Sequence, residues 1–301
     1  MKKQTIVPIL FAVLGNVIWG FSYLFIRVAL EANGNNSQQL LAHRFILSTA
    51  LMLLPLIIRK ARFSIKGKPL APVLLLMLMQ LGYYFFETQG ILYTNSTFAG
   101  MVLAAVPLGA IVTGILFLKE YPTKRQALFC LLPIVGIVVM TLSANELGVI
   151  TSVGVLCLFL CMCCSALYKT ANRKASVHFS TYERTLLINI ISAVAFTIVS
   201  LASDGWNVRN FLMPVVNASY VIPVFFLSVL CSIVANLMVN YAASKMSVFK
   251  LASFGALSTL VSTVMGVIVL EEPVSWMLLA GAAMILVGVQ QVIRPDKVKS
   301  K

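Results

Sequence analysis

The sequence contains few charged residues, and acidic residues are the scarcest of them. Aspartate and glutamate account for 9 of its 301 residues, and all charged residues for 11%, whereas soluble domains have about 25%. Hydrophobic residues make up 60% of the chain, and its mean hydropathy is +0.96. These values exclude a soluble enzyme, a disordered chain and a disulfide-stapled secreted module, and they indicate a protein whose main solvent is lipid.

Motifs for ATP use, metal binding and catalysis are also missing. No Gly-x4-Gly-Lys-[Ser/Thr] sequence occurs, so ATP is not expected to drive the protein. All six cysteines fall inside apolar runs, and Cys161-x-x-Cys164 lacks the second half of a zinc site. His-Glu-x-x-His is absent too, which leaves His43 as the single candidate base at membrane depth. We therefore expect no cofactor and no enzyme activity, with a membrane-embedded enzyme as a remote alternative.

Long apolar runs occupy most of the chain. A bilayer core is crossed by about 20 apolar residues of helix, so each run predicts one transmembrane helix. The first run follows Lys2 and Lys3 and is too long for the core of a signal peptide, so it too is interpreted as a span. The ten predicted helices cover residues 6–30, 40–58, 70–93, 98–118, 126–143, 149–168, 185–203, 220–243, 248–270 and 274–293.

The basic residues predict the orientation of these helices. With a cytoplasmic N-terminus, the inner segments hold 20 of the 23 lysine and arginine residues, including Lys169 and Arg184, and the outer loops hold only Arg209. Because lysine and arginine are enriched in cytoplasmic loops, both termini are expected inside. The same asymmetry explains the net charge of +14 without a nucleic-acid partner.

The sequence repeats itself at a constant offset of 152 residues. The identical pairs include Gly114/Gly266, Leu118/Leu270, Glu120/Glu272, Val135/Val287 and Gly136/Gly288. They align predicted helices 4–5 with helices 9–10, so one five-helix repeat is expected over residues 1–147 and a second over residues 148–301. An odd number of helices places the two repeats in opposite orientations. The predicted fold class is an all-α membrane protein of ten transmembrane helices in two inverted repeats, an architecture that holds substrate near the midplane.

Short motifs in both repeats resemble those of the drug/metabolite transporter superfamily, and within it the EamA family. They are Trp19-Gly20, His43-Arg44-Phe45, Leu118-Lys119-Glu120 with Gly136, and Leu270-Glu271-Glu272-Pro273 with Gly281 and Gly288. Lys119 and Glu271 replace the usual glycine of the turn. The resemblance covers nearly the whole chain and implies carrier-type transport of small organic solutes, often export of amino acids or related metabolites, at the inner membrane of a bacterium.

Glu87 is the one acidic residue well inside a predicted span, and Arg44 is the matching base on the preceding helix. Helix rise places both roughly 10 Å below the outer surface, so they could meet. In one interpretation they form a buried ion pair that fixes the two helices. In the other, Glu87 carries a coupling proton or contacts a cationic substrate amine. The sequence leaves both open.

Six further residues are candidates for lining the substrate site. Trp19 and Tyr84 could hold a cation over an aromatic face. We expect Tyr84 rather than Tyr83 to face the cavity, because it lies three residues from Glu87 on the same helix face. Uncharged polar side chains at membrane depth complete the predicted site, and these are Asn16, Gln80, Asn236 and Asn240.

Taken together, these features predict a secondary active or facilitative transporter of small organic metabolites that works by alternating access. Export of amino acids, related metabolites or drug-like compounds is the leading expectation, and uptake of a cationic metabolite such as a quaternary amine is the alternative. The expected partners are the small-molecule substrate, membrane lipid and, as a candidate coupling ion, the proton. The chain is expected to act as a monomer or homodimer.

Overall fold

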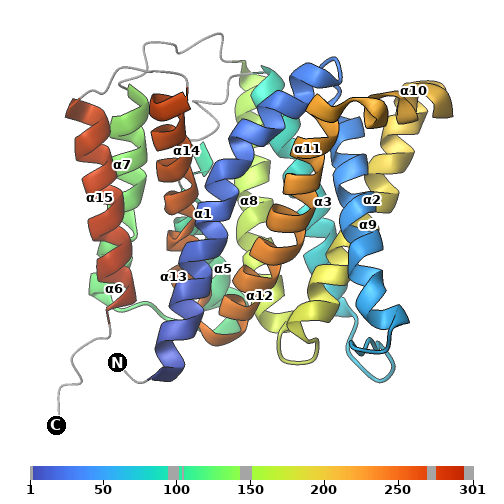
Figure 1. Cartoon of the computed structure of the whole chain (residues 1–301). Helices are drawn as coiled ribbons and strands as arrows, with labels where there is room; N and C mark the ends of the chain where they lie inside the picture. Colours follow the sequence, from blue (N-terminus) through green and yellow to red (C-terminus); the bar gives the residue numbers. More distant parts are fainter. Residues whose placement is uncertain (1–2, 94–101, 104, 143–150, 270–275, 295–301) are drawn as a thin grey trace.

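The computed structural model describes residues 3–93, 102–103, 105–142, 151–269 and 276–294. Within these ranges the regular elements are all helices, and they stand side by side as an upright bundle (Figure 1). Five helical segments are long and apolar enough to cross a membrane, and they cover Ile6–Ala32, Ser37–Ile57, Ser152–Ala175, Thr181–Ser203 and Ala218–Lys245. Shorter apolar helices cover Ala71–Glu87, Val106–Leu118, Val248–Ser262 and Leu279–Ile293. The described part of the chain is therefore an all-α membrane protein.

The helices follow the predicted apolar runs in order. In the first half they are α1 (Lys3–Ala32), α2 (Ser37–Ile57), α3 (Ala71–Tyr93), α5 (Val106–Leu118), α6 (Lys124–Phe129) and α7 (Leu131–Leu142). In the second half the elements up to the end of α12 are α8 (Ser152–Ala175), α9 (Thr181–Ser203), α10 (Val208–Leu212), η1 (Met213–Val216), α11 (Ala218–Phe226), η2 (Leu227–Ala235) and α12 (Asn236–Lys245). The last three are α13 (Val248–Ser253), α14 (Gly255–Val269) and α15 (Trp276–Ile293). The turn at residues 270–273, the start of the fourth predicted run and both chain ends lie outside the described residues.

Two predicted helix ends were wrong, because the helices continue past the apolar runs. Helix α8 extends to Ala175, although the run ends at Tyr168, and α9 begins at Thr181 rather than at residue 185. Ser180 starts α9 with a capping box, in which its hydroxyl accepts from the Glu183 N–H and the Glu183 carboxylate accepts from the Ser180 N–H. Such a box satisfies orphan donors of the first turn. Lys169 and Arg184 therefore lie within helices and not in a loop.

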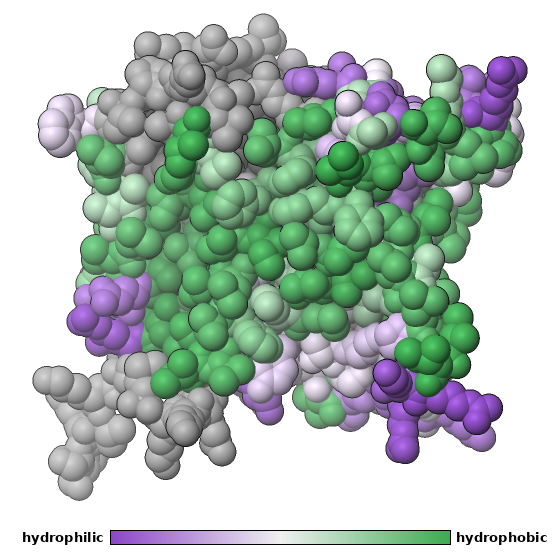
Figure 2. Space-filling model, viewed as in Figure 1, coloured by the Kyte–Doolittle hydropathy of each residue, from purple (hydrophilic) through white to green (hydrophobic). Residues whose placement is uncertain are grey.

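Apolar side chains cover the middle of one face of the bundle. In Figure 2 a band of hydrophobic residues occupies the centre of the visible face, and hydrophilic residues gather toward its two ends. Exposed aliphatic residues such as Leu116, Ile222 and Val287 contribute to the apolar surface of the molecule. A soluble monomer rarely exposes such a large contiguous apolar surface. The distribution fits a protein surrounded by lipid.

Close contacts between distant helices hold the bundle together. Helix α1 packs against α14 and against the stack of α11, η2 and α12, while α3 and α5 both pack against α8. Helix α2 pairs with α9, and α7 pairs with α15. Glycine allows the closest approaches: a Cβ atom at Gly20 of α1 would lie 2.5 Å from Val261 of α14, and one at Gly288 would lie 2.4 Å from Pro133. Small residues at such crossings are typical of membrane helices.

Two apolar segments are interrupted by a single residue. Cys130 separates α6 from α7, and Phe254 separates α13 from α14, and both have φ −67° and ψ −20°. In the first case Pro133 has no N–H to continue the bonding back to Phe129. In the second, Gly255 follows the break. The second break adjoins the candidate site described next.

Candidate functional site

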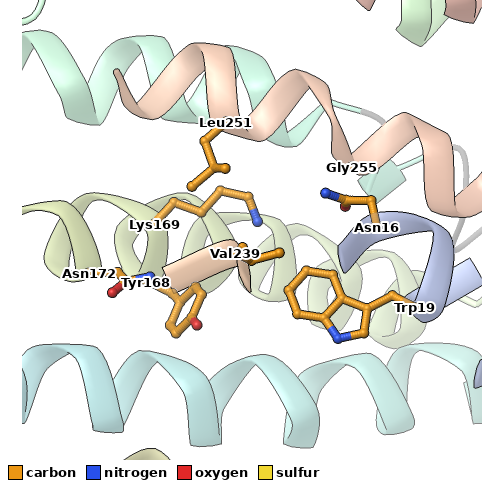
Figure 3. A pocket seen from close by; sticks show the side chains of 8 residues that line it. All are labelled: Asn16, Trp19, Tyr168, Lys169, Asn172, Val239, Leu251 and Gly255. Carbon is orange, nitrogen blue, oxygen red and sulfur yellow. The ribbon is translucent and has the colours of Figure 1, made fainter. Parts of the chain in front are cut away.

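A small cavity lies inside the bundle between α1, α8, α12, α13 and α14 (Figure 3). Its volume is about 20 Å³, which is enough for on the order of one water molecule. An organic solute therefore needs the surrounding helices to move before it can enter. The lining residues are Asn16, Trp19, Tyr168, Lys169, Asn172, Val239, Leu251 and Gly255.

Helix α1 contributes Asn16 and Trp19 from near its middle. The Asn16 side-chain amide donates to the carbonyl of Ala12 at 2.7 Å, one turn earlier on the same helix. The Trp19 indole N–H donates to the carbonyl of Cys231 at 3.2 Å and so joins α1 to η2. Both side chains are thus fixed by hydrogen bonds while they line the cavity, and their predicted role in substrate binding stays a prediction.

Helix α8 contributes Tyr168, Lys169 and Asn172. The partly buried Lys169 side chain extends toward the α1 residues, as Figure 3 shows. Lys169 lies six residues before the end of α8, or about 9 Å along the helix axis. Its ammonium lies 6.0 Å from the ring centre of Tyr168, and it forms no hydrogen bond or ion pair with a residue of the described ranges. The cavity thus has a cationic wall.

Behind Asn172, a buried polar network joins α8, α9 and α12. The guanidinium of Arg184, which is 0% exposed, donates to the carbonyl and side-chain oxygens of Asn172 and, at 2.9 Å, to the carbonyl of Asn240. The Asn172 amide in turn donates to Asn240 Oδ1 at 2.7 Å, and Asn240 Nδ2 donates to Thr185 Oγ1 at 2.7 Å. This network fixes the face of α8 that carries Lys169.

Glu87 lies beside Tyr83, away from the residues that line the cavity. The Tyr83 hydroxyl donates to the Glu87 carboxylate at 2.6 Å. Cys161 of α8 donates to the Tyr83 carbonyl at 3.5 Å, which places this pair against α8. Cys161 precedes Lys169 by eight residues, or about 12 Å along α8. We expected Tyr84 to be the tyrosine beside Glu87 on the cavity side, but the hydroxyl that meets the carboxylate belongs to Tyr83, one full turn away.

Arg44 is buried and does not form the ion pair with Glu87 that one interpretation of the sequence predicted. Its Nε donates to Ser232 Oγ at 2.7 Å, and its guanidinium carbon lies 5.4 Å from the ring centre of Phe45. These contacts attach α2 to η2 instead of to α3. The prediction used a shared depth alone, and depth does not determine which way a side chain points around its helix.

Tyr84 and Gln80 belong to an aromatic contact region between α2, α3 and α9. The Tyr84 ring centre lies 5.5 Å from that of Phe45 and 6.0 Å from that of Phe196, and the Gln80 side chain forms a hydrogen bond with Tyr84. Neither residue lines the described cavity. Their contacts contribute to packing, so a direct role in substrate binding stays a prediction.

Asn236 and Asn240 face protein rather than the cavity, although they were predicted to form a second polar wall. The Asn236 amide donates to the carbonyls of Cys231 and Ser232, both at 3.2 Å, within its own helical stack. These carbonyls belong to η2, a π-helical segment. Asn240 is part of the Arg184 network described above. The residue of α12 that reaches the cavity is Val239.

The sequence prediction missed the residues that give the cavity its charge. Lys169 was assigned to a cytoplasmic segment, because the apolar run ends at the residue before it. A signal was nevertheless present: Lys169 and Asn172 are three residues apart and so share a face if the helix continues. Within the described ranges, no three histidine, cysteine, aspartate or glutamate side chains gather as metal ligands.

The two-part match to a family model agrees with these structural features. The chain belongs to the EamA-like transporter family, whose model matches residues 6–142 and again residues 152–293. It is 31% identical over 293 residues to the "Uncharacterized transporter YcxC" of Bacillus subtilis (strain 168), covering 96% of this chain and 93% of that protein. An "Uncharacterized transporter" of Archaeoglobus fulgidus is 23% identical over 255 residues, or 83% and 86% of the two chains. The protein is thus a member of a membrane transporter family.

A solved structure has a similar fold. It is described as "Crystal structure of protein", and it superposes with a TM-score of 0.76 at 17% sequence identity. The match covers 96% of this chain and 99% of the other. At this level of identity the likeness concerns the fold alone.

Proposed function

We propose that the protein is a carrier that moves small organic metabolites across the bacterial plasma membrane by alternating access, with export of amino acids or related metabolites as the leading activity. The observation that carries this proposal is the position of the cavity. It lies between α1 of the first half and four helices of the second half. In transporters built from inverted repeats, substrate binds near mid-membrane where the repeats meet.

Symmetric helix contacts support the two-repeat arrangement of ten helices. The 152-residue offset relates Gly136 to Gly288 and Pro133 to Ile285. A Cβ atom at Gly136 would lie 3.1 Å from Ile285, and one at Gly288 would lie 2.4 Å from Pro133. The offset therefore exchanges one contact for the other, as a pseudo-twofold axis between two related repeats requires.

The same exchange extends to whole helices. Helices α1 and α8 open the two halves; α14 packs against α1, and its counterpart α5 packs against α8. Likewise the stack of α11, η2 and α12 packs against α1, and its counterpart α3 packs against α8. Helices α2 and α9 are mutual partners, as are α7 and α15. This pattern supports rocking of one repeat against the other as the transport movement.

Positions of the helix ends support an orientation with both termini cytoplasmic. Helix α1 begins, and α15 ends, at the lower end of the bundle in Figure 1. The basic loop between α2 and α3 lies at that same end, as does the loop between α8 and α9. Cytoplasmic loops are enriched in lysine and arginine, so the lower end of Figure 1 is assigned to the cytoplasm.

Glu87 supports a coupling role for the proton. It is a partly buried acidic residue in an apolar helix, and its described partner is the neutral hydroxyl of Tyr83 rather than a base. Intramembrane acidic residues of this kind mark proton relays and ion pathways in transporters. Solute exchange without proton coupling is the alternative. Measuring whether a proton gradient across vesicles drives transport distinguishes the two modes.

Exchange by reconstituted protein tests the proposal. Purified protein in liposomes is preloaded with an unlabelled candidate, and uptake of the same labelled amino acid or organic acid is measured. We expect at least one solute to show saturable counterflow. Gly255→Leu should abolish it, because a Cβ at Gly255 has open space around it and the larger side chain would fill the cavity. Ala280→Leu, at an exposed position of α15, is the matched control and should exchange normally. If Gly255→Leu exchanges solute as fast as the wild type, the transport route does not pass through this cavity.

A further inference from the structure

Lys169 is the charged residue that lines the cavity. Its neighbours on the cavity wall are uncharged, and within the described ranges no carboxylate contacts its ammonium. Placing a charged group inside a transmembrane bundle costs free energy, so such a group normally has a partner or serves a ligand or ion. Because Lys169 has no such partner among the described residues, its positive charge is expected to serve a ligand or ion.

Three acidic residues on or next to the neighbouring helices have other partners. These pairs are Glu87 with Tyr83, Glu120 with Arg173 at 3.1 Å, and Glu183 with Lys68 at 2.7 Å. Arg184 adds a second buried positive charge behind Asn172, and its described partners are neutral amide, carbonyl and hydroxyl groups. The cavity therefore lies beside an excess of positive charge, which favours an incoming anion.

Other cavity residues indicate what accompanies that anion. Tyr168 is 7% exposed and also lines the cavity, where its ring centre lies 6.0 Å from the Lys169 ammonium. Trp19, Val239 and Leu251 contribute apolar surface to the same cavity. A single ammonium suits a singly charged carboxylate. Multiply charged phosphate is more often held by several arginine or backbone donors.

We propose that Lys169 binds the carboxylate of the transported solute, and that the apolar cavity walls receive its hydrocarbon part. The inference rests on the proposed carrier function and specifies its substrate class: small organic acids and amino acids, rather than quaternary amines. Glu87 has a partner of its own, because its carboxylate accepts a hydrogen bond from the Tyr83 hydroxyl at 2.6 Å, and it does not line the cavity.

Two matched sets of compounds test the charge preference on the wild-type protein. The first is L-leucine, 4-methylpentanoate and 3-methylbutylamine, and the second is L-phenylalanine, 3-phenylpropanoate and 2-phenylethylamine. Within each set the carbon skeleton is kept while the carboxylate or the ammonium is removed. Thermal unfolding of purified protein in detergent reports binding, because a ligand of the folded state raises the Tm in a concentration-dependent way. We expect a carboxylate-bearing compound to raise the Tm and the amines to leave it unchanged.

Three variants test whether Lys169 binds the carboxylate. Lys169→Met should weaken binding of the carboxylate compound by about tenfold or more, the scale of one hydrogen bond to a charged group. Lys169→Arg should restore part of it. Lys174→Met removes an exposed lysine from the last turn of the same helix and should bind like wild type. If Lys169→Met does not fold, the wild-type comparison within each set still decides the charge preference.

The inference is overturned if the amines stabilise the protein, if no carboxylate compound does, or if carboxylates bind Lys169→Met as tightly as wild type. Counterflow in liposomes separates this failure from failure of the carrier function. Exchange without carboxylate preference would reject only the role of Lys169. Binding of carboxylates without exchange of any solute would reject the carrier function and keep the site.

Discussion

Arg184 and Lys169 are two basic residues inside the same end of the bundle, yet their surroundings differ. Arg184 is fully buried and donates hydrogen bonds to oxygens of Asn172, Thr181 and Asn240. Its Nε alone lacks a partner among the described residues. Lys169 lines a cavity and has no such bonds to residues that the structure describes. A buried charge whose partners come from three helices is part of the structure, whereas a buried charge that faces a cavity is available to a ligand.

The chemistry of the two side chains matches their surroundings. Arginine presents several donors in a rigid plane and can hold carbonyls of different helices at once. Lysine is a compact ammonium on a flexible stem, suited to a partner that arrives and leaves. Three substitutions test this comparison. They remove the charge of Arg184, overfill the helix contact at Gly20 and partly fill the cavity at Gly255.

Loss of Arg184 should produce the largest effect on stability. Arg184→Ala leaves the carbonyls of Asn172 and Asn240 without their donor and creates an internal void. Hydrogen bonds to a charged group and buried cavities each carry costs of this order, so we expect the free energy of unfolding to fall by about 3 kcal/mol. Denaturation in detergent measures it, with Lys174→Ala as the control. A change below about 0.5 kcal/mol, the usual range for surface substitutions, would mean that the network does not stabilise the bundle.

Overfilling the contact between α1 and α14 should have an intermediate effect. In Gly20→Ala the added Cβ would lie 2.5 Å from Val261 and 2.9 Å from the backbone oxygen of Ser258. Because a backbone atom cannot give way easily, we expect a loss of about 1–3 kcal/mol, typical of overpacking. Thermal unfolding measures the loss. Stability equal to wild type would show that α1 and α14 can separate at this point without cost.

A methyl group in the cavity should have the smallest effect on stability, and of opposite sign. Gly255→Ala places a Cβ atom in open space at the first residue of α14 and reduces the freedom of the unfolded chain, so the free energy of unfolding should rise by about 0.4–1 kcal/mol. Counterflow should slow at the same time because the cavity is smaller. A variant that is both more stable and as fast as wild type would separate Gly255 from the transport route.

Much of the fold could be predicted from composition and spacing, because lipid as solvent demands long apolar helices. Asn16 and Trp19, which were predicted to line a substrate site, both line the described cavity. The ends of α8 and α9 could not be predicted from apolar runs, since a helix continues through polar residues when neighbouring helices supply hydrogen bonds. Lys169 was missed for that reason. The partners of Arg44 and Glu87 depend on helix rotation, which hydropathy does not encode.

A carrier must also keep the membrane electrically tight between transport cycles. The cavity beside Lys169 holds on the order of one water molecule, so it offers little of the water chain along which protons leak. A fixed positive charge on its wall raises an electrostatic barrier to protons and metal cations, as basic residues do in selective pores. We therefore expect the lysine proposed for substrate recognition to oppose the leakage of cations as well, when no substrate is bound.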